Sequence, residues 1–112
     1  MKGTNLGELE ELVLLVVANL DDDAYGLAIR NYIKAKCERS VSISTVHATL
    51  HRLELKGFVS SRYDSQATGE RGGRPKLLFT ITASGERAMR YTRDLRNNLW
   101  STIPKLSFNQ SI

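Results

Sequence analysis

Cysteine, tryptophan and proline are scarce in this 112-residue chain, which contains one, one and two of them. Because Cys37 is the only cysteine, no intramolecular disulfide can form, which excludes a secreted, disulfide-stapled fold and fits a reducing cytosol. No apolar run approaches the roughly 18 residues of a membrane-spanning helix. Acidic residues near the start stand where a signal peptide needs its apolar core. We therefore expect a soluble cytoplasmic protein without a membrane partner.

The chain also lacks the motifs that most enzymes of known classes carry. It has no nucleophile elbow, no phosphate-binding P-loop and no pair of carboxylates flanked by a histidine. Internal repeats, low-complexity tracts and interdomain linkers are absent as well. The sequence therefore predicts a non-enzymatic protein without a cofactor. Its length suits one small domain, whose limited core favours pairing with a second copy.

Charge is distributed unevenly along the chain. The formal net charge is +4, but residues 1–23 hold one base and six acids, net −5, which leaves net +9 for residues 24–112. The basic part is a candidate surface for a polyanion such as nucleic acid.

Hydrophobic periodicity predicts two helices in the first third of the chain. Over residues 5–20, apolar side chains recur at helical spacing, and Leu14 and Leu15 add apolar surface on a second side. The run Asp21 to Asp23 interrupts this pattern, and Asp23 or its neighbour is suited to cap a second helix through Lys36. The inner stripe of that helix consists of Tyr25, Ala28, Ile29, Tyr32 and Ile33.

A third helix is predicted after Ser42 or Ser44, either of which can cap it, and it ends at Gly57. Its core-facing positions are Ile43, Val46, Leu50 and Leu53. The opposite face is short or polar and contains no carboxylate, so it can approach a groove lined by phosphates. Its residues are Ser44, Thr45, His47, Ala48, His51 and Arg52.

A basic β-hairpin and a last helix follow. Strands are predicted over residues 58–63 and 77–82, joined by a polar, glycine-rich loop, and Thr82 caps a helix that ends before Pro104. The predicted fold is mainly α with a small hairpin: a winged helix-turn-helix with a three-helix core and a two-stranded wing, plus a C-terminal helix. We divide the chain into a DNA-binding domain (1–82), a dimerisation helix (83–103) and a tail that we expect to be flexible (104–112).

This arrangement predicts contacts with duplex DNA. A surface helix fits the major groove, where hydroxyls and imidazoles can meet base edges and Arg52 lies nearer the phosphates. Glycines in the hairpin tip let the backbone approach a phosphate strand or a narrow minor groove. The predicted DNA contacts are Ser42, Ser44, Thr45, His47, Ala48, His51 and Arg52 on the third helix and Arg71, Gly72, Arg74 and Lys76 on the wing.

Four segments of the sequence together resemble the PadR family of winged-helix transcriptional regulators, in particular its short members with a single C-terminal helix. They are L-G-E-L-E-E-L-V-L-L, A-Y-G-L-A-I, S-V-S-I-S-T-V-H-A-T-L-H-R-L-E-L-K-G-F-V and G-E-R-G-G-R-P-K-L-L-F-T-I-T-A-S-G. The resemblance implies a homodimeric repressor that reads a pseudo-palindromic operator and that a small apolar effector releases. It also implies that the first and last helices form the dimer contact, through Leu9, Val13, Tyr91, Leu95, Leu99 and Trp100.

Two other interpretations of the same residues stay open. His47 and His51 are four residues apart on one helical face, a spacing that can bind zinc, with Cys37 as a third ligand; this would make a metal-responsive regulator. A winged helix can also serve as a protein–protein interaction module, although that use suits an uncharged wing better than this basic one.

Overall fold

The computed structural model describes residues 5–64 and 75–105 of the chain. Its elements follow the predicted order of three helices, a hairpin and a last helix. They are α1 (Glu8–Leu20), the short 3-10 helix η1 (Asp21–Asp23), α2 (Gly26–Cys37), α3 (Ile43–Leu55), β1 (Val59–Tyr63), β2 (Leu77–Ile81) and α4 (Ala83–Ser101).

A single hydrophobic core joins the first three helices to the hairpin. α1 packs on both α2 and α3, and its side chains Val13, Leu14 and Val17 are fully or almost fully buried. Ile29 and Ile33 from α2 and Leu50 and Leu53 from α3 complete the centre of the core. Each helix thus buries part of the apolar stripe that its period predicted. Of the two leucines expected on a second side of α1, Leu14 is fully buried and Leu15 is exposed.

Two local predictions in this helical part are wrong. The three aspartates form η1, and Tyr25 rather than Asp23 is the N-cap of α2, without a side-chain hydrogen bond. Ile43 does not face the core: it is the first residue of α3 and is 37% exposed. Periodicity predicts which face of a helix a residue lies on. It does not show over which part of its length that face is covered by other elements.

The hairpin is a two-stranded antiparallel sheet in which Val59 pairs with Ile81 and Tyr63 with Leu77. On its other side β2 contacts the segment before α2, because the Phe79 N–H donates to the Ala24 carbonyl at 2.8 Å and Leu78 bridges Tyr25. The predicted alternation of Leu77, Phe79 and Ile81 is therefore incomplete, since Leu78 is buried as well as Phe79. This contact ties the base of the wing to α2.

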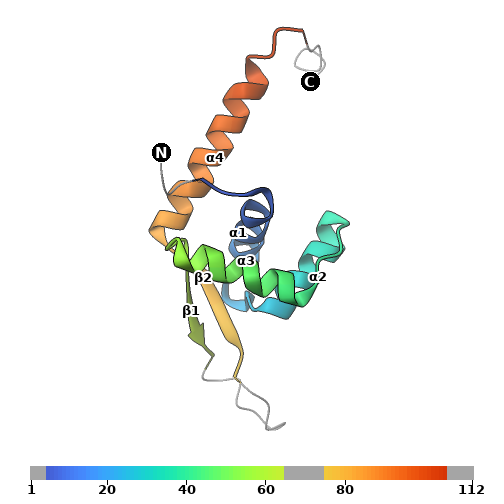
Figure 1. Cartoon of the computed structure of the whole chain (residues 1–112), viewed down its shortest axis with the longest axis vertical. Coiled ribbons are helices and arrows are strands. Elements are labelled where there is room, and N and C mark those ends of the chain that lie inside the picture. The colour runs from blue at the N-terminus through green and yellow to red at the C-terminus, as the bar shows by residue number, and fades with distance from the viewer. Residues whose placement is uncertain (1–4, 65–74, 106–112) are drawn as a thin grey trace.

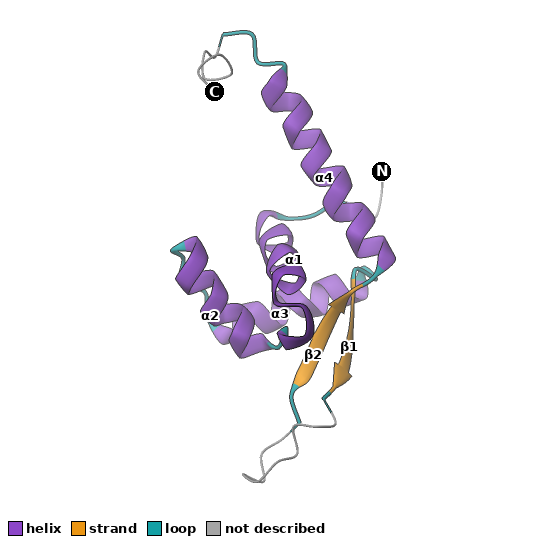
Figure 2. Ribbon diagram, turned by 180° about the vertical axis from the view of Figure 1, so that it is seen from behind, coloured by secondary structure: helices purple, strands orange, loops and turns teal. Residues whose placement is uncertain are grey.

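α4 starts at a closely packed junction with the hairpin. Thr82 caps the helix by accepting from the Gly85 N–H at 3.0 Å, and its own hydroxyl donates to the Gly57 carbonyl at 2.6 Å. From this point α4 leaves the core in the direction opposite to β1 and β2, as both views show (Figures 1 and 2). α4 contacts both α1 and β2, and its last turns extend past the core (Figure 1).

Candidate nucleic-acid interface

Hydroxyl groups cluster at the N-terminus of α3. The Ser42 side chain caps the helix by accepting from the Thr45 N–H at 3.1 Å, which confirms one of the two predicted caps. Its Oγ also donates to Thr45 Oγ1 at 2.9 Å and lies 3.1 Å from Ser44 Oγ. All three side chains are exposed. The helix start therefore presents three hydroxyls that can donate or accept hydrogen bonds.

The exposed face of α3 continues without a charged group for two turns. His47, Ala48 and His51 are exposed, as the sequence predicted for this face. His47 lies against α2: a Cβ added to Gly26 would come within 2.6 Å of its Cε1 atom. The two helices of the helix-turn-helix thus meet where a glycine leaves room for the imidazole, which sets the position of that ring.

The cations at the far end of α3 contact a buried carboxylate. Lys56 Nζ lies 2.7 Å from Glu10 Oε1, and Arg52 Nε lies 3.4 Å from Glu10 Oε2. Arg52 also donates to Thr49 Oγ1 at 3.2 Å. Sequence reasoning assigned Arg52 to the phosphates and missed Glu10. The signal was present, because Glu10 precedes Val13 by three residues and Val17 by seven, on the face that the core covers.

The pKa of Glu10 is set by opposing effects. Burial alone would raise the pKa of this carboxyl group. Hydrogen bonds from the Lys56 ammonium and the Gly7 N–H, the positive charge of Lys56 and a hydrogen bond from Arg52 outweigh that effect and lower the pKa below 4.5. Glu10 is therefore charged at neutral pH, with two cations to balance it.

The other acids in the first turn of α1 bind further elements. Glu8 accepts from Arg39 in the loop between α2 and α3 at 2.7 Å, and Glu11 lies 3.1 Å from Arg96 of α4. The acidic start of the chain, which composition marked only as a region of negative charge, thus contacts three basic segments.

The base of the wing lies beside α2. Lys76 Nζ stands 4.3 Å from the centre of the Tyr25 ring, a cation–π distance. Arg62 on β1 is exposed. The predicted contacts Arg71, Gly72 and Arg74 lie outside the described residues, so Lys76 and Arg62 are the wing cations that the structure positions.

The residues predicted for the dimer contact divide into two groups. Val13 is wrong as a contact, because it is 0% exposed and packs inside the core of its own chain; Leu9 packs partly against the same core. Tyr91, Leu95, Leu99 and Trp100 are exposed on α4. Leu95 and Leu99 continue the stripe of Ala88 and Thr92, which is buried where α4 still lies beside the core.

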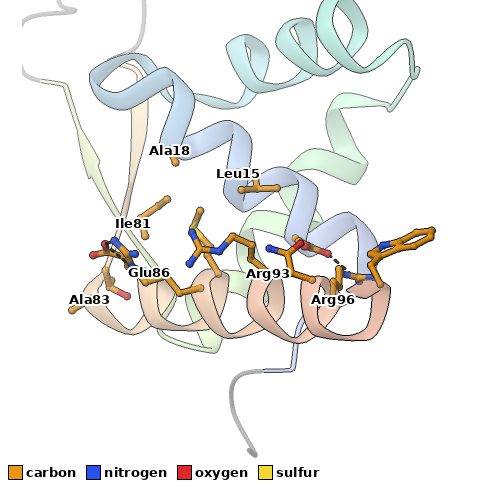
Figure 3. Close-up of a pocket in the computed structure, with 13 residues that line it drawn as sticks. Leu15, Ala18, Ile81, Ala83, Glu86, Arg93 and Arg96 are labelled. Carbon is orange, nitrogen blue, oxygen red and sulfur yellow. Dashed lines mark hydrogen bonds and ion pairs between the residues drawn. The ribbon is translucent and has the colours of Figure 1, made fainter. Parts of the chain in front are cut away.

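A groove of about 790 Å³ runs between α1 and α4 (Figure 3). Leu15 and Ala18 line it from α1, and Ile81 and Met89 add apolar surface. Arg93, Arg96 and Trp100 line it from α4, and Arg96 is held by its ion pair with Glu11. The groove therefore combines an apolar floor with charged margins.

Residues 5–64 and 75–105 contain no group of three or more His, Cys, Asp or Glu side chains placed to hold a metal ion. Over the same ranges, no helix is both long and apolar enough to cross a bilayer. Cys37 is half-buried and packs against the core.

Three helices whose third leads directly into a β-hairpin define a winged helix-turn-helix protein, the class that the sequence predicted. The chain belongs to the transcriptional regulator PadR-like family, whose family model matches residues 13–91. Both the predicted fold and the resemblance are confirmed, and the family is one of transcriptional regulators, not of enzymes. No curated protein matches the chain significantly in sequence.

Solved structures of the same family share this fold. A PadR family regulator from Clostridium difficile R20291 is 22% identical, with a TM-score of 0.68 over 87% of this chain and 95% of that one. One from Eggerthella lenta is 26% identical, with a TM-score of 0.65 over 86% and 82%. Bacillus subtilis PadR, solved in complex with operator DNA, is 24% identical, with a TM-score of 0.60 over 73% of this chain and 44% of that one.

Proposed function

We propose that this protein is a homodimeric repressor that reads a pseudo-palindromic operator with α3 and its wing. The observation that carries the proposal is the exposed face of α3 from Ser42 to His51, which presents hydroxyls and imidazoles without a carboxylate beside a basic hairpin. Such groups can exchange hydrogen bonds with base edges in a major groove about 12 Å wide. The complex of Bacillus subtilis PadR with operator DNA supports this use of the fold.

In this proposal the residues divide by role. Ser42, Ser44, Thr45, His47, Ala48 and His51 meet base edges or the nearest phosphates from the first turns of α3. On the wing, Arg71, Gly72, Arg74 and Lys76 contact the backbone or the minor groove. Two copies related by a twofold axis would place their α3 helices in successive major grooves about 34 Å apart.

The dimer contact is proposed for the later turns of α4. Leu95 is 47% exposed and Leu99 is 59% exposed, and they follow an apolar stripe that the core of the same chain covers only in its first turns. A second copy that covers these leucines together with Tyr91 and Trp100 would remove a contiguous apolar surface from water.

An apolar effector that releases the DNA would fit the groove between α1 and α4. Its lining includes the apolar side chains Leu15, Ile81 and Met89, together with Trp100. Since Trp100 is the only tryptophan of the chain, its fluorescence reports on that groove and on the proposed dimer contact, so the measurement is made at a concentration where the oligomeric state does not change. A planar aromatic probe that changes this emission and also lowers the affinity for the operator would support an effector site. A probe that changes neither would indicate that the groove does not bind an effector of this kind.

Selection of bound fragments from a random duplex pool tests the proposed function. The account expects one enriched, inverted-repeat sequence. Thr45→Ala and His51→Ala should then weaken binding to that sequence by about 1 to 3 kcal/mol per lost contact, with little effect on an unrelated duplex. Equal losses on both duplexes would reduce these residues to phosphate contacts, and a pool without enrichment would contradict sequence-specific reading.

A further inference from the structure

Glu10 is the one charged side chain that is buried among the residues the structure describes, with 6% of its surface exposed. It lies in the first turn of α1, outside the helix that carries the proposed base contacts. Each of its carboxylate oxygens faces a different cation of that helix end: Oε1 is 2.7 Å from Lys56 Nζ, and Oε2 is 3.4 Å from Arg52 Nε. Lys56 is further fixed by a 3.0 Å hydrogen bond to the Asn5 carbonyl.

These two cations are the whole formal positive charge of residues 42–57. Thr49, which is buried, accepts a second hydrogen bond from Arg52 and so holds the guanidinium on the side of α3 that faces α1. From Ser42 to His51 the exposed side chains include no Lys, Arg, Asp or Glu, and the exposed Glu54 follows near the end of the helix. Lys56 and Arg52 of this segment therefore both bind groups of the protein itself.

We propose that Glu10 is a positioning residue of the DNA interface: it holds Arg52 and Lys56 against α1, so that α3 meets the duplex through neutral side chains and does not bind phosphates with its own cations. This inference rests on the proposed function. Phosphate contacts are independent of sequence. By withdrawing two of them from the reading helix, Glu10 lowers affinity for all duplexes and raises discrimination among them.

Replacement of Glu10 by its neutral isostere tests the inference. Glu10→Gln frees both cations, so binding to a duplex of unrelated sequence should tighten, and the salt slope of log K should steepen by up to about two, since each phosphate contact adds roughly 0.9. Glu8→Gln is the matched control. It removes one negative charge from the same turn, where Glu8 pairs with Arg39 at the surface, and should leave the slope unchanged. Circular dichroism establishes that each variant is folded.

Arg52→Gln supplies the second arm and does not depend on the stability of Glu10→Gln. In the otherwise native chain it should leave the salt slope unchanged, whereas in the Glu10→Gln background it should reduce the slope by about one. A lower slope for Arg52→Gln alone would overturn the inference, because Arg52 would then contact phosphate already. A folded Glu10→Gln variant with the native slope would overturn it too. Native protein that binds no duplex would instead refute the proposed function, and the inference with it.

Discussion

The imidazole of His47 lies against the backbone of Gly26, so close that a methyl group at residue 26 would stand 2.6 Å from Cε1 and 2.7 Å from Nε2. Gly26 is the first residue of α2, and its backbone angles do not require glycine. The glycine is thus needed for space, and what fills that space is a side chain of the proposed DNA-reading helix. This contact is one of those that join α2 to α3.

Gly26→Ala should move the His47 ring without unfolding the protein. The ring can rotate away at small cost, so we expect a change in the free energy of unfolding within about 1 kcal/mol. The His47 resonances should shift in NMR spectra, while those of His51, one turn further along α3, should not. Identical His47 chemical shifts in the native protein and in Gly26→Ala would contradict the contact.

Gly85→Ala should be far more damaging, because there the new methyl group meets backbone. A Cβ at Gly85 would lie 2.1 Å from the Phe58 carbonyl oxygen, which already accepts from the Thr82 N–H at 3.0 Å. We expect a loss of about 1 to 3 kcal/mol, typical of overpacking, in urea-induced unfolding. Ser84→Ala in the same turn is the control and should change stability by less than about 0.5 kcal/mol. An unchanged midpoint for Gly85→Ala would mean that α4 does not start against the hairpin.

Acid should weaken the fold through Glu10. Because its pKa is lowered in the folded chain, the carboxylate contributes stability that is fully present above its ordinary value of 4.5 and that is lost as pH falls through the folded value. The difference in urea midpoint between native protein and Glu10→Gln should therefore shrink between about pH 6 and pH 3. Lys56 and Arg52 are the cations that face the carboxylate. A difference that does not change with pH would refute the ionic role of Glu10.

Leu95→Asp together with Leu99→Asp should yield monomers. A carboxylate buried in an apolar seam costs several kcal/mol unless it is paired, so the second copy should dissociate at micromolar concentration. Leu27→Asp is the matched control, because Leu27 on α2 is as exposed as Leu95, at 47%. Sedimentation velocity that finds dimers of the double variant, or monomers of the control, would move the dimer contact away from the end of α4.

Local sequence signals predicted the elements well, and contacts distant in sequence explain what they missed. The Ser42 and Thr82 caps and the burial of Val46, Leu50 and Leu53 on α3 follow from neighbours within a few residues, and the structure confirms them. The partners of Glu10 lie 42 and 46 residues further along the chain, and Lys76 meets Tyr25 across 51. No periodicity encodes such pairs.

The errors in the core have the same origin. The core position of Ile43 follows from helical period, which gives the angular position of a residue around its helix but not which neighbour covers it. The dimer role of Val13 follows from the family resemblance, which does not show that neighbour either. Val13 is covered by the core of its own chain, whereas Ile43, at the start of α3, lies beyond the residues that cover the rest of the stripe and is exposed. An acid on an apolar face, as at Glu10, was the one sequence signal that pointed beyond local structure.

Salt dependence of duplex binding tests the central claim, contact of α3 and the wing with DNA, most directly. Fluorescence anisotropy should show affinity that falls steeply with salt, and Arg71→Ala with Arg74→Ala should reduce the magnitude of the slope by up to about two, at roughly 0.9 per phosphate contact. An unchanged slope would remove the wing from the interface. Native protein that binds no duplex even at low ionic strength would contradict the whole account.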